Sequence, residues 1–72
     1  MNGYSKGTTV EWDCGNGTGQ GTIAERYTDD VTKMIKGSEI SRRASSQEPA
    51  YLIEQEDGNR VLKSHSEVRL PS

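Results

Sequence analysis

Residues 49–63, with the sequence PAYLIEQEDGNRVLK, form the densest apolar run of the chain and contain its clearest turn signal. Two strand-like runs flank Glu56-Asp57-Gly58, which is the pattern of a β-hairpin. A left-handed Gly58 after a type I turn would give a three-residue loop with a bulge. A two-residue loop at Asp57-Gly58 would instead pair apolar with charged residues, so we expect the bulged register. It makes three cross-strand pairs, worth roughly 0.2–1 kcal/mol each: Glu54 with Arg60, Ile53 with Val61, and Leu52 with Leu62.

The composition indicates one small folded domain rather than a disordered chain. The 72 residues carry a net charge of only −2, and 29% of them are hydrophobic. This is enough for a core near the lower limit of independent stability. The apolar residues occur in short runs divided by turn signals, without a convincing helix or an internal repeat. Six short strands are therefore expected.

Several classes of protein do not fit this sequence. No apolar run approaches the length of about 20 residues that a membrane span requires, and the N-terminus lacks the apolar centre of a signal peptide. Cys14 is the one cysteine and His65 the one histidine, so the chain offers neither an intrachain disulfide nor a cysteine cluster for zinc. We expect a cytoplasmic protein with no metal and no cofactor.

The first third of the chain alternates between strand patterns and glycine. A period-two pattern predicts a strand with Val10, Trp12 and Cys14 on its buried face. Residues 15–21 have a glycine at every second position and are expected to be a flexible connector. Their spacing matches neither a dinucleotide-binding fingerprint nor a P-loop. A second strand is expected over residues 22–28.

Residues 31–44 contain a second hairpin pattern, in the middle of the chain. A two-residue loop at Gly37-Ser38 suits a type II′ turn, which favours glycine in its first position. This register makes two favourable pairs, Lys36 with Glu39 and Ile35 with Ile40. It also places Lys33 opposite Arg42, and two like charges in that position destabilise a sheet. The hairpin is long for a small barrel and is expected to protrude.

The strand count predicts the fold class. Short twisted strands without a helix protect their edges by curling into a small barrel, so we expect an all-β, SH3-like barrel of five to six antiparallel strands. The expected domain covers residues 7–69. Residues 1–6 are polar and are expected to be a flexible N-terminus, and residues 70–72 a tail.

Several segments together resemble the hypervirulence-associated Tudor-domain proteins, a family of small bacterial and fungal domains. The similarity runs from about Gly7 to Glu67, and the stretch 49–55 is its most specific part. The matching segments are Val10-Glu11-Trp12, Gly21-Thr22-Ile23, Ile35-Lys36-Gly37, Pro49-Ala50-Tyr51-Leu52-Ile53-Glu54-Gln55, Asp57-Gly58, Val61-Leu62-Lys63 and Ser66-Glu67. The resemblance implies a Tudor-like barrel and carries little information about activity.

The sequence does not contain the residues of a familiar catalytic site. A nucleophile needs a base within reach, but His65 lies in a polar Ser-His-Ser segment with no distinctive partner. Cys14 shares a face with Val10 and Trp12, where a small buried thiol is the ordinary expectation. We therefore expect a non-catalytic binding module.

The aromatic residues offer a candidate ligand site. Trp12, Tyr27 and Tyr51, together with Glu54 and Asp57, would form a groove for a protein segment, and the acidic residues would favour a basic one. A partial cage for a methylated cation is a more specialised version of this site. The simpler alternative is that the rings fill the core, because the chain has no phenylalanine.

The middle hairpin offers a different site. Its basic residues, Lys33, Lys36, Arg42 and Arg43, would contact the phosphates of a nucleic acid. The acidic sequence pI of about 5.3 and the four acidic residues of segment 46–59 count against a polyanion. Nucleic-acid binding is thus the alternative to protein binding. A second copy of the chain is a third candidate partner.

Overall fold

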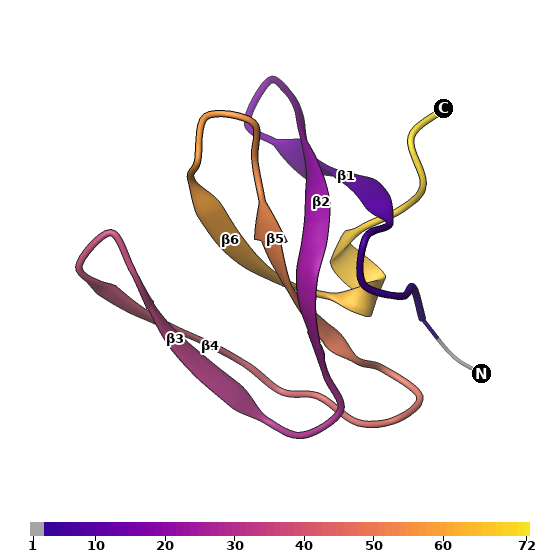
Figure 1. Cartoon of the computed structure of the whole chain (residues 1–72), viewed down its shortest axis with the longest axis vertical. Helices are drawn as coiled ribbons and strands as arrows, with labels where there is room; N and C mark the ends of the chain where they lie inside the picture. The colour runs from indigo at the N-terminus through magenta and orange to yellow at the C-terminus, as the bar shows by residue number, and fades with distance from the viewer. Residues whose placement is uncertain (1–2) are drawn as a thin grey trace.

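The computed structural model describes residues 3–72, which form six β-strands and one turn of 3-10 helix (Figure 1). The protein is an all-β domain, as the sequence predicts. The elements are β1 (Thr9–Cys14), β2 (Gly17–Tyr27), β3 (Val31–Ile35), β4 (Ser38–Arg42), β5 (Ala50–Glu54), β6 (Arg60–Ser64) and η1 (His65–Glu67).

Four strands form a curled antiparallel sheet in the order β1-β2-β5-β6, which makes half of a barrel (Figure 1). The long strand β2 pairs with β1 through its first half and with β5 through its second half. A register shift between Ile23 and Glu25 interrupts the ladder with β5, and such an irregularity bends a strand. Strands β3 and β4 form a separate two-stranded sheet, the hairpin, which leaves the main sheet after Tyr27 and returns at Ala50, its partner in the ladder.

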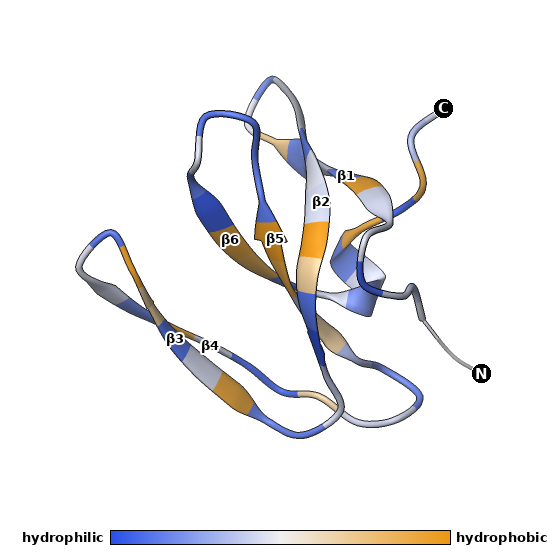
Figure 2. Cartoon of the chain, viewed as in Figure 1, coloured by the Kyte–Doolittle hydropathy of each residue, from blue (hydrophilic) through white to orange (hydrophobic). Residues whose placement is uncertain are grey.

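The main core lies on one face of the curled sheet. Figure 2 shows hydrophobic residues on β2, β5 and β6 next to one another across the sheet. Tyr4 and Val61 pack against the edge of this cluster. Its buried members are Val10, Trp12, Ile23, Tyr51, Ile53 and Val68.

Strand β5 is buried on both faces. Its first four residues, 50–53, are all buried, although side chains on a strand point alternately to opposite sides. Leu52 and its partner Leu62 therefore lie on the face opposite the main core. The hairpin packs near β6 and turns the half-buried residues Ile35 and Ile40 to one of its own faces.

The β5–β6 hairpin has the predicted register. Gly58 has a φ of 86°, and its N–H donates to the Gln55 carbonyl at 2.9 Å. The N–H of Gln55 donates to the carbonyl of Asn59 at 2.8 Å, which closes the loop. The pairs are Glu54 with Arg60, Ile53 with Val61, and Leu52 with Leu62. The bulged loop is confirmed.

The predicted register of the β3–β4 hairpin is wrong, because the turn lies one residue earlier in the sequence than predicted. The turn residues are Lys36 and Gly37, with φ values of 52° and 78°, which is the type I′ pattern rather than type II′. Lys33 consequently faces Ile40 instead of Arg42, so the like-charge pair is avoided. The other observed pairs are Val31 with Arg42, Thr32 with Ser41, Met34 with Glu39, and Ile35 with Ser38.

The glycine-rich segment is mostly strand, not a flexible connector. Only Gly15 and Asn16 form a turn, and β2 begins at Gly17. A Cβ on Gly19 would lie 2.5 Å from the indole Nε1 of Trp12, so the absent side chain leaves room for that ring. Cys14 is exposed rather than buried, because it is the last residue of β1 and the core beneath Trp12 does not extend to it.

Both ends of the described chain are tied to the sheet. The N–H of Tyr4 donates to the hydroxyl of Tyr51 at 2.8 Å, so part of the segment expected to be flexible packs against the core. Residues 1 and 2 lie outside the described residues. Near the C-terminus, Arg69 and Glu11 exchange two backbone hydrogen bonds of 2.8 and 2.9 Å, which extend the sheet beside β1.

Candidate functional site

A polar groove of about 610 Å³ lies where β1 and β2 meet the β5–β6 loop. Because three carboxylates line it, we call it the acidic groove. Its lining residues are Thr9, Gln20, Gly21, Thr22, Glu54, Gln55, Glu56 and Asp57.

The sheet order brings these distant segments together. Thr22 of β2 is paired on one side with Thr9 and on the other with Glu54, the last residue of β5. A Cβ on Gly21 would lie 2.6 Å from the carbonyl oxygen of Glu54, so the missing side chain permits the close approach of β2 to β5. The groove thus has a rigid floor of sheet backbone and one wall made by the β5–β6 loop.

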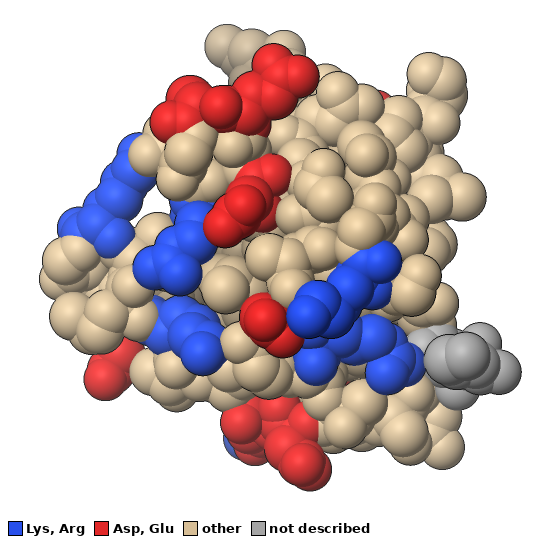
Figure 3. All heavy atoms as spheres, viewed as in Figure 1, with Lys and Arg blue, Asp and Glu red and all other residues tan. Residues whose placement is uncertain are grey.

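The carboxylates of the groove differ in their partners. The Asp57 carboxylate accepts two hydrogen bonds from Asn59. The backbone N–H of Asn59 donates at 2.9 Å and its side-chain amide at 2.8 Å. Glu54 and Glu56 are exposed and form no ion pair within residues 3–72, although Arg60 lies opposite Glu54 in the ladder. Figure 3 shows acidic side chains gathered over the β5–β6 loop. These carboxylates are available to a cation from outside.

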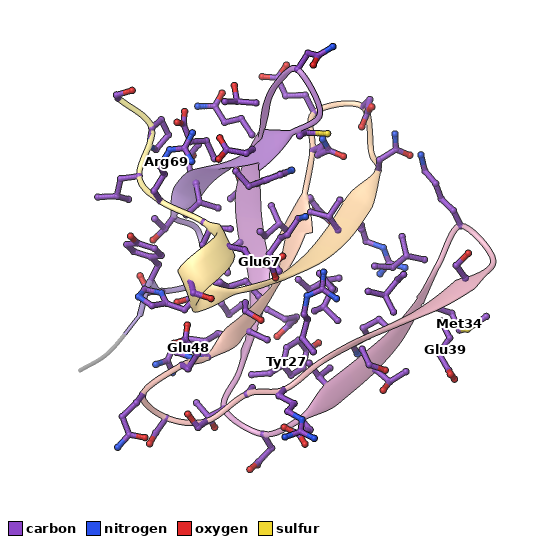
Figure 4. All side chains as sticks on the ribbon, turned by 180° about the vertical axis from the view of Figure 1, so that it is seen from behind. Tyr27, Met34, Glu39, Glu48, Glu67 and Arg69 are labelled. Carbon is purple, nitrogen blue, oxygen red and sulfur yellow. The ribbon has the colours of Figure 1, made fainter. Side chains whose placement is uncertain are left out.

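The three aromatic residues of the predicted site do not line the groove. Trp12 and Tyr51 are 3% and 0% exposed and belong to the core, as the simpler alternative predicts. Tyr27 is half-buried near the base of the hairpin (Figure 4), and the ammonium of Lys33 lies 5.1 Å from its ring centroid. The Tyr27 ring therefore already has a cation partner within the chain.

Tyr51 is the centre of a structural hydrogen-bond network. Its hydroxyl accepts the N–H of Tyr4 and lies 2.9 Å from Nδ1 of His65, and the Tyr4 and His65 rings are 5.0 Å apart. Burial raises the pKa of Tyr51, and the opposing effects of the Tyr4 hydrogen bond and Arg26 do not cancel it. The phenol stays protonated at neutral pH, and the histidine serves to hold the N-terminal segment against the sheet.

Two of the basic residues of the hairpin, Lys33 and Arg42, are half-buried on the same face of it. Lys33 contacts Tyr27, and Arg42 donates through Nε to Glu67 at 2.8 Å and through Nη1 to the Ser41 carbonyl at 2.9 Å. Lys36 at the turn and Arg43 after β4 are exposed and form no ion pair within the described chain. Lys33 and Arg42 are thus already engaged within the chain, which leaves Lys36 and Arg43 for an outside partner.

A second depression, of about 380 Å³, lies beside η1 and has charges of both signs. Except for Lys63, its ionic groups already form ion pairs, with one another or with residues next to the depression. Glu67 accepts from Arg42, and Arg69 donates to Glu11 and Asp13 at 2.8 and 3.0 Å. The acidic groove therefore remains the better candidate site.

A minor part of the candidate site could be found from the sequence. Glu54 and Asp57 are predicted site residues and do line the groove, next to Glu56. Thr9, Gln20 and Thr22 were not predicted, because they join the groove only through the β1-β2-β5 order. Within residues 3–72, no three His, Cys, Asp or Glu side chains are grouped to hold a metal ion, and no helix is long and apolar enough to span a membrane.

The half-barrel of short antiparallel strands defines a Tudor-like domain. More specifically, residues 7–68 match the family model described as the hypervirulence-associated proteins TUDOR domain, and the chain belongs to that family. The resemblance noted in the sequence is confirmed. No curated protein and no solved structure matches the chain significantly. Tudor-like domains are binding modules for proteins or nucleic acids, and this is the class of function that the family indicates.

Proposed function

We propose that the protein is a non-catalytic binding module that recognises a basic protein segment through the acidic groove. The proposal rests on one observation: Glu54 and Glu56 face a preformed groove and have no cationic partner within residues 3–72. Lysine or arginine side chains of a ligand would supply these partners, and the hydroxyl and amide groups of Thr9, Gln20 and Thr22 would bond its polar groups.

The expected binding is weak and depends on salt. Ion pairs at exposed sites contribute only about 0–1 kcal/mol each, and added salt screens them. Trp12 and Tyr51 contribute to this proposal as core residues that hold β1, β2 and β5 in place. The basic segment does not need to be methylated, because no aromatic ring lines the groove.

A two-dimensional NMR titration with a short lysine- and arginine-rich peptide tests the proposal. We expect chemical-shift changes at residues 20–22 and 54–57, and none with an acidic peptide of the same length. Combined Glu54→Gln and Glu56→Gln changes should weaken binding about fivefold or more, because two ion pairs worth up to ~1 kcal/mol each are lost.

The matched control combines Asp29→Asn and Glu48→Gln, which remove two exposed acidic charges outside the groove. It should bind the basic peptide like the wild type. If neither groove segment shifts at millimolar peptide, or if both double variants lose affinity equally, the groove is not the binding site.

Nucleic-acid binding through the hairpin is the alternative, supported by the two exposed cations Lys36 and Arg43. It is the weaker proposal, because Lys33 and Arg42 are engaged within the chain. If this alternative holds, the protein should retard oligonucleotides in a gel in a salt-dependent manner. This retardation should be lost when Lys36 and Arg43 are changed to Glu.

A further inference from the structure

The β3–β4 hairpin has two open edges. It forms a two-stranded sheet of its own, and no strand within residues 3–72 pairs with either outer edge. Unpaired strand edges offer backbone N–H and C=O groups to another chain. The hairpin is therefore a candidate surface for pairing with a further strand.

The turn determines which backbone groups face outward on β4. In a hairpin with a two-residue turn, the residues that flank the turn, Ile35 and Ser38, form a hydrogen-bonded pair. The alternation along the strand then directs the N–H and C=O groups of Glu39 and Ser41 to the open edge, and Arg43 follows directly after β4. The Ser41 carbonyl also accepts from Arg42 at 2.9 Å, and its second lone pair remains available.

We propose that the open edge of β4 pairs with the same edge of a second copy of the chain. The two strands would run antiparallel about a two-fold axis at Ser41 and join two hairpins into a continuous four-stranded sheet. We identify the partner as a second copy because the charges along this edge become complementary when two copies of it pair antiparallel.

The charge pattern supports this register. With Ser41 opposite Ser41 of the second copy, Glu39 lies opposite Arg43, and the symmetry repeats that pair. Both residues are exposed and form no ion pair within the described chain. Figure 4 shows Glu39 on the side of the hairpin that faces away from the main sheet, where a second copy can approach it.

The other symmetric arrangements are less favourable. Pairing of β3 with itself about Lys33 would place two lysines opposite each other, and pairing about Met34 makes no pair of opposite charges. Pairing of β4 about Ile40 places Glu39 opposite Ser41, without an ion pair. Only the register about Ser41 joins Glu39 to Arg43.

Sedimentation equilibrium with charge-swapped variants tests this proposal, independently of the acidic groove. At low salt and up to about millimolar concentration, the wild type should dimerise weakly, as expected for a small contact. Glu39→Arg alone and Arg43→Glu alone should each weaken the dimer about tenfold or more, because like charges then face each other across both symmetric positions. The combined variant should return to within about threefold of the wild type, since the opposite charges are restored.

The control is Glu56→Arg, the same charge change on the β5–β6 loop, which should leave dimerisation unchanged. Circular dichroism of each variant verifies that it is folded. A wild type that stays monomeric at millimolar concentration would overturn the proposal. So would a dimer that the single swaps leave unchanged, or one that the double swap does not restore, since either result requires another surface or register.

Discussion

The guanidinium Nε of Arg42, in β4, lies 2.8 Å from the carboxylate Oε1 of Glu67, in η1. The same oxygen accepts the backbone N–H of Ser64 at 2.8 Å. One carboxylate therefore joins the hairpin to the end of β6 and to the helical turn that follows it. Among the ion pairs of residues 3–72, this one links the hairpin to the rest of the domain.

This link should make the protein sensitive to acid. Burial alone would raise the pKa of Glu67, but the hydrogen bonds from Arg42 and Ser64, with the charges of Arg42 and Lys63, outweigh it and hold the pKa below its ordinary value of 4.5. A carboxyl whose pKa is lowered by folding stabilises the fold above its unfolded pKa, and this stability is lost as the pH falls through the folded pKa. Glu67→Gln should therefore lower the melting temperature at pH 7, and the difference from the wild type should shrink below pH 4.5.

Thermal unfolding between pH 7 and pH 3 measures this effect. Glu48→Gln, which removes an exposed carboxylate without an ion pair, is the matched control and should follow the wild type. If the melting temperatures of the wild type and Glu67→Gln differ by the same amount at every pH in this range, the prediction is contradicted.

The close approach of β2 to β5 depends on Gly21. Gly21→Ala should destabilise the protein by about 1–3 kcal/mol, because the added Cβ would lie 2.6 Å from the backbone oxygen of Glu54, which cannot move without disturbing the ladder. Gly17→Ala is the control in the same strand, since nothing lies within 4 Å of its Cβ position. Urea denaturation compares the two. Equal free energies of unfolding would show that the strand spacing adjusts freely.

Removal of the Tyr51 hydroxyl should destabilise the protein more than removal of the Tyr27 hydroxyl. Tyr51→Phe leaves the N–H of Tyr4 and Nδ1 of His65 without their partner, and the loss of such bonds costs about 1–3 kcal/mol. Hydrogen exchange should then accelerate at the Tyr4 amide before it does in β5. Tyr27→Phe is the control, because the Tyr27 hydroxyl has no hydrogen bond within residues 3–72. Unchanged exchange at Tyr4 would argue against the network.

Lys36 adopts an unfavourable backbone conformation. Its φ of 52° lies in the left-handed region, which costs a residue with a Cβ roughly 1 kcal/mol. Lys36→Asn should raise the free energy of unfolding by a few tenths to about 1 kcal/mol, since asparagine followed by glycine suits a type I′ turn. The control is Lys6→Asn, at an exposed position without a positive φ, which should not raise the free energy of unfolding. A destabilised Lys36→Asn variant would contradict the turn assignment.

A hairpin register can be predicted from the sequence where the turn residues adopt the conformations that they prefer. The β5–β6 register was predictable because it depends on a local loop and on pairs such as Ile53 with Val61. The β3–β4 register was not, because it requires Lys36 to accept a conformation that its own preferences disfavour. Avoidance of the Lys33–Arg42 pair was the available clue.

The parts that were missed depend on contacts between distant strands. Gly19 and Gly21 suggest flexibility when read alone, but in the sheet they make room for Trp12 and Glu54. The pairing of β2 with both β1 and β5 brings Thr9 to the acidic groove beside Glu54, which lies far along the chain. No local pattern in the sequence contains this information.

The hairpin leaves the main sheet and rejoins it at a single rung of the ladder, where Tyr27 is paired with Ala50. Residues 28–49 thus form an arm whose two ends are already neighbours. Adding or removing matched residues on β3 and β4 near the turn changes the length of this arm but shifts no register in the sheet that carries the acidic groove. The outer part of the arm and the acidic groove can therefore be altered separately by mutation.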